Sequence, residues 1–294
     1  MMFRYGHELL KLAEDHDKKI SELVLEREVE LTGETRDDIR ERLYESFGVM
    51  RSSANSGMER AVESMGGLLG GDAKKVKEYA ETKNKGFCGA NMLTAAARAL
   101  SCSEINASMG RICASPTAGS CGIVPAVMTT AAEILDADKD LIIDGLLVAA
   151  GVGIIVQTNA TVSGAEGGCQ AECGAAAAMA AAGIVEMAGG TPAQSLEAAS
   201  IAFKNIMGLV CDPIAGLVEA PCAKRNASGA ANAMLSADLA LAGVKSAVPF
   251  DEVVDAMFEV GRSLPFELRE TALGGIAATP TGKALTEKIF GPEA

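Results

Sequence analysis

Apolar residues in this chain recur with helical rather than strand spacing. Thr35 and Asp38 stand three positions apart, as the residues that cap a helix N-terminus do. The apolar residues that follow lie four positions apart and share one helical face: Ile39, Leu43 and Phe47. The pattern predicts an amphipathic helix that begins directly after Thr35.

The sequence predicts a second helix start at Thr191. Pro192 occupies the first turn, and Gln194 follows three residues after the capping residue. Apolar residues continue along one stripe of this segment: Leu196, Ala199, Phe203 and Ile206. Alternating patterns typical of strands are scarce elsewhere. The predicted fold class is therefore mainly α, a compact domain rich in alanine and glycine helices.

Two uncharged apolar runs, Gly145–Val156 and Gly174–Val185, are twelve residues long each. A membrane-spanning helix needs about 20 residues, so both runs predict buried helices and no membrane span. Residues 175–182 are seven alanines and one methionine. A helix with so little side-chain volume must be covered by neighbours on most sides. Its small residues either pack a tight core or leave room for a bulky group that is not protein.

Charge divides the chain into three parts. Residues 1–50 carry twenty-one charged side chains and predict a charged N-terminal helical segment. Residues 51–85 form a Ser/Gly-rich connecting region, with a loop or hinge expected over Ser52–Gly71. Residues 86–294 are expected to form the helical body, and 141–240 contain only eleven charges. The whole is expected to be one domain.

The composition excludes several functions. The chain has 294 residues, with 26 Lys and Arg against 39 Asp and Glu, a net charge of −13. Nucleic acids and anionic membrane surfaces need a basic face, so neither is an expected partner. The charged N-terminal fifty residues do not resemble a signal peptide. A cytoplasmic location is expected, where thiols stay reduced and available to metals.

The chain contains eight cysteines, and their role needs an explanation because the composition does not give one. No pair has the Cys-x-x-Cys spacing of a zinc ribbon or a thioredoxin-like site. The two histidines, His7 and His16, lie in the charged N-terminal segment and are expected to be solvated. A zinc site with mixed ligands is therefore disfavoured. The cysteines are Cys88, Cys102, Cys113, Cys121, Cys169, Cys173, Cys211 and Cys222.

Three of these thiols lie in distinctive surroundings. Cys169 follows two glycines and precedes the alanine helix, so its sulfur is expected at a helix N-terminus, where thiolate is favoured. Cys211 is followed by Asp-Pro, and Cys222 is preceded by proline. Three thiolates on constrained turns are suited to an iron–sulfur cluster. The residues alone leave a metal site and simple core packing open, with Cys173, four positions after Cys169, as a further candidate.

Longer segments around these cysteines resemble the iron–sulfur L-serine dehydratases, in particular the α chain of the two-chain form. The resemblance runs from Phe3 to Gly291 and is carried by SMGRICASPTAGSCGIVPAV (108–127), TNATVSGAEGGCQAECG (158–174), GLVCDPIAGLVEAPCAKRNA (208–227) and LRETALGGIAATPTGKALTEKIFG (268–291). It implies that Cys169, Cys211 and Cys222 bind a [4Fe–4S] cluster whose fourth iron is open to substrate.

The activity implied by this resemblance is the elimination of water from L-serine, giving pyruvate and ammonia. The open iron would act as a Lewis acid toward the departing hydroxyl, a role that metals play at developing alkoxides. Pyridoxal phosphate is the alternative cofactor for this reaction. No glycine-rich phosphate loop paired with a suitable Schiff-base lysine is visible, so it is not expected.

Groups that bind the substrate carboxylate and ammonium are expected in three segments that flank the ligands. The Ser-Pro-Thr-Ala-Gly-Ser turn offers hydroxyl and backbone N–H groups to a carboxylate, and two cations directly follow the third ligand. Each of these residues also has an ordinary structural interpretation, as a cap, a turn or a surface cation. The candidates are Ser115, Thr117, Gly119, Ser120, Asn159, Ser163, Gly164, Lys224, Arg225 and Asn226.

Two features distinguish the chain from single-chain members. Residues 290–294 contain no thiol, so a C-terminal cysteine ligand is not expected, and residues 17–294 contain no histidine. Single-chain relatives carry a histidine in their other domain that could serve as base, so the resemblance implies that the base, and part of the substrate pocket, come here from a separate β chain. A related cluster lyase acting on L-threonine or L-cysteine, or a non-catalytic iron–sulfur redox sensor, remains an alternative. The roles of Cys88, Cys102, Cys113, Cys121 and Cys173 stay open.

Overall fold

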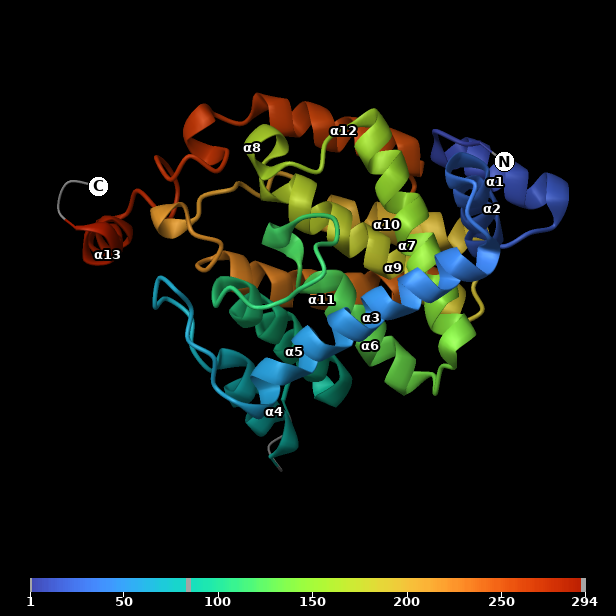
Figure 1. Cartoon of the computed structure of the whole chain (residues 1–294). Coiled ribbons are helices and arrows are strands. Elements are labelled where there is room, and N and C mark those ends of the chain that lie inside the picture. Colours follow the sequence, from blue (N-terminus) through green and yellow to red (C-terminus); the bar gives the residue numbers. More distant parts are fainter. Residues whose placement is uncertain (1, 83–85, 292–294) are drawn as a thin grey trace.

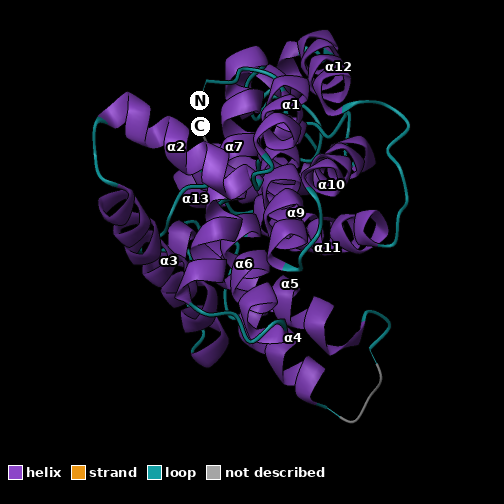
Figure 2. Cartoon of the chain, turned by 90° about the vertical axis from the view of Figure 1, so that its right-hand side faces the viewer, coloured by secondary structure: helices purple, strands orange, loops and turns teal. Residues whose placement is uncertain are grey.

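The computed structural model describes residues 2–82 and 86–291, and within them the secondary structure is helical with no strand (Figures 1 and 2). The mainly α prediction is confirmed. The helices are α1 (Gly6–His16), α2 (Ile20–Thr32), α3 (Arg36–Glu59), α4 (Asp72–Glu81), α5 (Gly89–Ala107), α6 (Ile123–Ile134), α7 (Lys139–Asn159), α8 (Gly164–Gly167), α9 (Ala175–Met187), α10 (Pro192–Asn205), α11 (Cys222–Leu241), α12 (Phe250–Ser263) and α13 (Pro280–Phe290).

The alanine helix α9 lies at the centre of the molecule and packs against α6, α7, α10 and α11 (Figure 1). Its seven alanines in residues 175–182 have no exposed surface, which confirms that it is covered on most sides. Two glycines set its distance from α7, because a Cβ at Gly183 would lie 2.6 Å from the backbone oxygen of Gly145. Small residues therefore allow near-backbone contact between these helices.

Both predicted helix starts are confirmed. Thr35 Oγ1 accepts the Asp38 N–H at 3.2 Å and caps α3. Thr191 Oγ1 accepts the Gln194 N–H at 3.2 Å, while Gln194 Oε1 accepts the Thr191 N–H at 2.9 Å. These reciprocal bonds satisfy backbone donors that have no partner within α10.

The loop predicted over Ser52–Gly71 is wrong for residues 52–59, which continue α3. Small residues here do not break the helix because they serve close packing against α5. The Gly57 N–H donates to Ser101 Oγ at 2.8 Å, and Ser101 Oγ donates to the Ser53 carbonyl at 2.6 Å. The chain leaves the helix only at Arg60.

The helix α7 is long and apolar enough to cross a membrane, the one such helix in the part of the chain that the structure describes. It packs between α2 and α9, and 67% of its most apolar 18-residue stretch is buried inside the protein. Burial against other helices explains its apolar composition without a bilayer.

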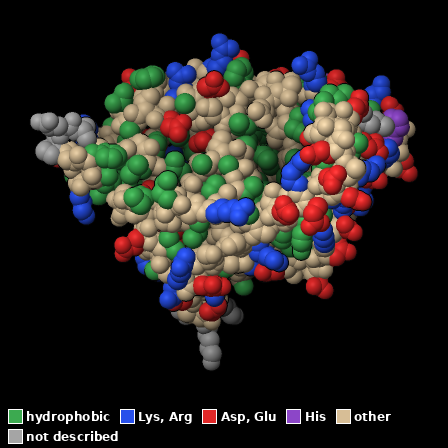
Figure 3. Space-filling model, in the orientation of Figure 1, with side chains coloured by type: hydrophobic (Ala, Val, Ile, Leu, Met, Phe, Trp, Pro, Cys, Tyr) green, Lys and Arg blue, Asp and Glu red, His purple; other side chains and the backbone are tan. Residues whose placement is uncertain are grey.

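The C-terminal helix α13 packs on the 3₁₀ turn Ile214–Gly216 and lies at the edge of the molecule (Figure 1). Charged side chains crowd the surface over α1 and α2, whereas hydrophobic side chains are more frequent toward α13 (Figure 3). The thiol-free terminus noted in the sequence falls partly on residues 292–294, which lie outside the described residues, as do 83–85 of the expected connecting region.

Candidate functional site

The three predicted ligand cysteines come from separate segments, and each is buried. Cys169 precedes a π-turn, Gln170–Gly174, that leads into α9, so the expected position at a helix N-terminus is confirmed. Cys222 is the first residue of α11. Cys211 lies between α10 and α11, where its N–H donates to the Leu268 carbonyl at 2.9 Å and its carbonyl accepts the Glu270 N–H at 2.7 Å.

Cys169 is the most acidic thiol of this group. Hydrogen bonds from Cys173 and Cys211 hold the pKa of Cys169 well below its usual value, against burial, and the charge of Arg225 adds to the effect. The bond to Cys169 raises the pKa of Cys173, and burial raises the pKa of Cys222 to about 12. The buried Cys169 thiolate is therefore stabilised by the neighbouring donors Cys173, Cys211 and Arg225.

Arg225 is the cation that compensates this negative charge. Its Nη1 donates to the Val210 carbonyl at 2.8 Å, and its Nη2 lies 2.8 Å from Asp212 Oδ1. Burial opposes the charged form, but the Cys169 thiolate and Asp212 raise the pKa of Arg225. Asp212 follows Cys211 directly and is only 2% exposed, so its buried carboxylate needs the guanidinium as a partner. Arg225 therefore fixes the Cys211 loop as well as the Cys169 thiolate.

Gln170 joins the Cys169 turn to its surroundings. Its Nε2 donates to the carbonyls of Gly167 and Met257, both at 2.9 Å, and its Oε1 accepts the Gly208 N–H at 2.8 Å. The side chain is fully buried with each of these groups satisfied. It therefore ties the turn to α12 and to the segment that leads to Cys211.

The Ser115–Ser120 segment meets the start of α11 through Asn226. Asn226 Nδ2 donates to the carbonyls of Gly119, at 2.8 Å, and Cys222, at 2.9 Å, while its Oδ1 accepts the Gly122 N–H at 2.8 Å. One amide thus aligns the predicted substrate segment with the third predicted ligand. Ser115 is buried.

Glu172 is a site residue that the sequence analysis did not single out. Thr117 Oγ1 donates to Glu172 Oε1 at 2.8 Å, although 55 residues separate them. Burial raises the pKa of Glu172 to about 7, and the Thr117 bond opposes the rise. The only available sequence signal was a charge in an otherwise apolar helix start, which does not reveal what the carboxylate faces.

Other predicted residues have structural partners of their own. Asn159 Nδ2 donates to the carbonyls of Arg4, at 2.7 Å, and Ile155, at 2.8 Å, at the end of α7. Ser163 precedes α8, and its carbonyl accepts N–H bonds from that turn. Gly164 lies beside Cys211, because a Cβ there would be 3.1 Å from the sulfur.

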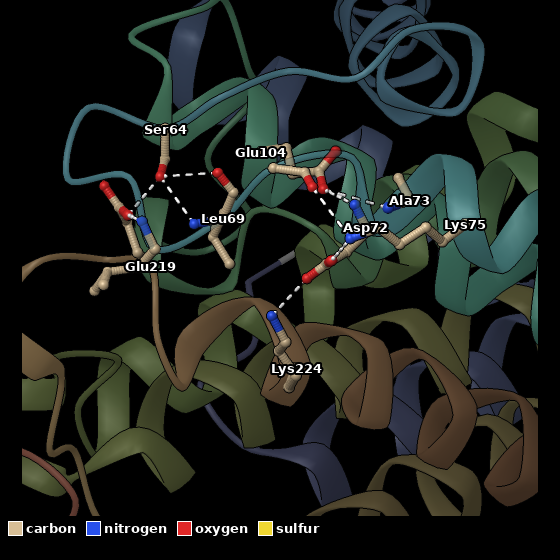
Figure 4. A network of polar contacts seen from close by, with 10 residues as sticks. Ser64, Leu69, Asp72, Ala73, Lys75, Glu104, Glu219 and Lys224 are labelled. Carbon is tan, nitrogen blue, oxygen red and sulfur yellow. Dashed lines mark hydrogen bonds and ion pairs between the residues drawn. The ribbon is translucent and has the colours of Figure 1, made fainter. Parts of the chain in front are cut away.

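Lys224 is half-exposed and binds Asp72 Oδ2 at 2.7 Å, so its ammonium group joins a polar network at the surface (Figure 4). In the same view, Asp72 also binds Lys75, and the buried Glu104 accepts the Asp72 N–H. Arg225, the next residue along α11, is instead the cation beside the thiols.

Glu219 holds the loop before α4 onto the segment between Cys211 and Cys222 (Figure 4). Its carboxylate accepts bonds from Ser64 Oγ at 2.5 Å, Gly66 N–H at 2.7 Å and Leu68 N–H at 3.0 Å. Because Glu219 lies three residues before Cys222, this loop is fixed to the start of α11. Sequence reasoning missed it, since its partners are about 150 residues away.

The remaining thiols lie in other surroundings. Cys102 and Cys121 are buried in a small apolar cluster with Ala54. Burial raises the pKa of Cys102 to about 12 and that of Cys121 well above its usual value. Cys113 is half-buried, and Cys88 is exposed at the start of α5.

Comparison with known proteins identifies the family of the chain. Residues 15–277 match the family described as serine dehydratase alpha chain. The chain belongs to this family. It is 49% identical over 290 residues, 99% of this chain and 96% of the relative, to a probable L-serine dehydratase, alpha chain, from Bacillus subtilis.

Other relatives in the family differ in length. The chain is 49% identical over 284 residues to the L-serine dehydratase, alpha chain, of Peptoniphilus asaccharolyticus, covering 97% of each. It is 39% identical over 282 residues to the L-serine dehydratase of Streptomyces coelicolor, covering 94% of this chain and 60% of the relative. Longer relatives thus carry a further part in the same polypeptide.

The donor chemistry of Cys169, Cys211 and Cys222 is compatible with an iron–sulfur cluster. Among the described residues, no three His, Cys, Asp or Glu side chains are arranged to hold one metal ion. Thiolates that hold a [4Fe–4S] cluster bind different irons and do not converge on one point. Cys169, Cys211 and Cys222 supply soft, buried donors from three fixed segments, with Arg225 beside them. This donor set suits a cluster.

Proposed function

We propose that this chain is the α chain of an iron–sulfur-dependent, two-chain L-serine dehydratase that converts L-serine to pyruvate and ammonia. The observation that carries the proposal is the meeting of Cys169 and Cys211, with Cys222 in electrostatic range, beside Arg225. Relatives that align with almost the whole chain bear the name L-serine dehydratase, alpha chain. The family supports an amino-acid-degrading enzyme, for which we propose a cytoplasmic location.

Cys169, Cys211 and Cys222 would hold a [4Fe–4S] cluster, which supplies Lewis acidity toward the leaving hydroxyl of the substrate. The protein holds these donors by backbone bonds at Cys211 and by helix starts at the other two. Arg225 balances the negative charge of the thiolates. The buried hydroxyl of Ser115 and that of Thr117 lie in the segment that Asn226 aligns with Cys222.

The net chemistry needs a base for the Cα proton. Loss of this proton and of hydroxide gives an enamine, which becomes an imine and is hydrolysed to pyruvate and ammonia. His7 and His16 are the only histidines of the sequence and both lie in α1. His7 is exposed and binds Asp251 at 2.8 Å. We assign the base to a separate β chain, which supplies what longer relatives carry in one polypeptide.

Exposed apolar side chains near Cys211 support this partner. Phe266, Leu273 and Ile276 are 60%, 62% and 41% exposed, and their segment bonds directly to Cys211 and Asp212. Exposed apolar groups beside a site are typical of a surface that another chain covers.

Anaerobic purification of the α chain, alone and with its β chain, tests the function. We expect iron and sulfide in the α chain, and pyruvate formation from L-serine only after the β chain is added. Full serine turnover by the α chain alone would refute the assignment of the base. An active enzyme without iron would refute the cluster.

Parallel assays distinguish the alternatives in substrate. Pyruvate from L-serine, 2-oxobutyrate from L-threonine and sulfide from L-cysteine are measured on the same preparation. We expect the highest kcat/KM for L-serine. Iron binding without turnover of any of the three, with the β chain present, would indicate a redox sensor instead.

A further inference from the structure

Two thiols of one turn lie side by side in the protein interior. Cys169 Sγ is 3.4 Å from Cys173 Sγ across the π-turn Gln170–Gly174, and both residues are buried. A disulfide joins its two sulfurs at about 2.05 Å. The pair is therefore within a small side-chain movement of forming one.

A cavity reaches this pair from one side. It has a volume of about 370 Å³ and lies between the segment that follows α10 and the first two turns of α11, with Cys173 in its wall. The exposed residues Asn205, Gly208 and Ser228 also line it, so the cavity opens to solvent. A water molecule needs only about 10–15 Å³ of such space. A molecule as small as hydrogen peroxide can therefore enter and meet Cys173.

Cys211 is the other thiol that contacts Cys169, but its position is more constrained. Backbone bonds to Leu268 and Glu270 fix the chain at Cys211. A Cβ at Gly164 would lie 3.1 Å from the Cys211 sulfur, so this sulfur is also closely packed. The neighbour four residues away on the same turn is therefore the favoured disulfide partner for Cys169.

We propose that Cys169 and Cys173 form a reversible disulfide when peroxide enters this cavity while Cys169 holds no iron. The inference rests on the proposed function, because it concerns a predicted cluster ligand. One thiolate attacks a peroxide oxygen and becomes a sulfenic acid, while the O–O bond breaks and the other oxygen leaves as hydroxide, which takes up a proton. The second thiol attacks the sulfenic sulfur, the S–O bond breaks and a second water leaves. Two electrons pass from the sulfurs to the peroxide.

The disulfide gives Cys173 a function other than ligation. While the two sulfurs are joined, Cys169 cannot bind iron, so a cluster cannot be rebuilt on this turn. The same bond prevents further oxidation of Cys169 to a sulfinic or sulfonic acid, which a thiol reductant does not reverse. A dithiol reductant restores both thiols by exchange. The pair thus preserves a ligand thiol while oxidant is present.

Peptide mapping of the α plus β complex tests the pairing without relying on turnover. The cluster is removed with a chelator under anaerobic, reducing conditions, and the reductant is then removed. The complex is treated with hydrogen peroxide, and the remaining thiols are alkylated before digestion with trypsin. Mass spectrometry of the peptides then shows which thiols were protected from the label.

The sequence makes this map unambiguous. No lysine or arginine lies between residues 140 and 203, so trypsin releases peptide 140–204 with Cys169 and Cys173 as its only cysteines. The next peptide, 205–224, carries the other two predicted ligands. We expect peptide 140–204 to lose both labels and two hydrogen atoms after peroxide treatment, and to regain both labels when dithiothreitol precedes alkylation.

Cys173→Ser tests the protective role through iron content. This variant keeps the size of the side chain but leaves Cys169 without its partner, so we expect peptide 140–204 to gain oxygen atoms that dithiothreitol does not remove. After reduction, added iron and sulfide are expected to rebuild the cluster in the wild type and not in Cys173→Ser. Cys102→Ser, at a buried thiol outside this group, is the matched control and is expected to recover its iron.

The other outcomes are equally decisive. Full labelling of peptide 140–204, or a cross-link between it and peptide 205–224, would overturn the pairing. Equal recovery of iron in the wild type and Cys173→Ser would overturn the protective role. If Cys173→Ser binds no iron before peroxide treatment, the wild-type map decides alone. A complex that forms the disulfide but never binds iron or turns over serine would instead refute the proposed function.

Discussion

Cys169 Sγ lies 3.4 Å from Cys173 Sγ, across the π-turn that begins the central helix α9. The wider turn brings two thiols four residues apart into contact, and π-turns of this kind are frequent at functional sites. Cys173 lowers the pKa of Cys169 more than any other group does. The turn therefore prepares a buried thiolate at the N-terminal end of the most enclosed helix.

Alanine substitution of the cysteines is expected to separate ligands from packing residues. We expect Cys169→Ala, Cys211→Ala and Cys222→Ala each to lose the iron and the visible absorption. Cys102→Ala, a matched buried control outside the thiol group, and the exposed Cys88→Ala are expected to keep both. Equal losses in all five variants would contradict the ligand assignment.

The adjacent cations on α11 are expected to behave differently. Arg225→Ala leaves Asp212 buried without its partner, and we expect a loss of about 3–5 kcal/mol in the free energy of unfolding, with poor retention of iron. Lys224→Ala removes an exposed ion pair with Asp72, which is worth about 0–1 kcal/mol. Urea unfolding and iron content check both. Loss of serine turnover in Lys224→Ala would support the prediction that Lys224 binds substrate.

Glu104 is expected to make stability fall as pH rises. It is fully buried, and burial raises its pKa above the usual 4.5, against bonds from the Ala73 and Asp72 N–H groups. Above pH 4.5 the native state holds this proton more tightly than the unfolded state, so the unfolding free energy decreases with pH up to the native pKa.

Glu104→Gln keeps an acceptor oxygen and removes this titration. Urea unfolding from about pH 5 to about pH 8 is expected to show a flatter dependence than the wild type. Glu45→Gln, on the exposed side of α3, should follow the wild type. A slope unchanged by Glu104→Gln would show that other groups cause the dependence.

The close contact of α7 and α9 is expected to tolerate no added methyl group. Gly183→Ala places Cβ against the Gly145 backbone oxygen, which cannot rotate away, and is expected to cost about 1–3 kcal/mol. Gly48→Ala is a matched helical control with nothing within 4 Å of the new Cβ, and it should stabilise by about 0.5–1 kcal/mol. Thermal unfolding measures both, and equal melting temperatures would contradict the packing argument.

Local signals in the sequence correctly predicted local structure. The caps at Thr35 and Thr191 depend on residues three positions apart, and the burial of the alanine helix follows from its own composition. The loop prediction failed at residues 52–59 because Ser101, more than forty residues away, fills the space that small residues leave. Glycine and serine do not show by themselves whether they end a helix or let another approach.

By itself, the sequence determined the helical class, the helix starts and, through resemblance, the three cysteines and their family. Only the tertiary structure decided which polar groups surround them. Lys224 and Arg225 are neighbours in sequence, but successive residues of a helix point about 100° apart, so one reaches Asp72 and the other the Cys169 thiolate. Glu172 meets Thr117 only because the packing of α9 brings their segments together, and no short-range pattern encodes that contact.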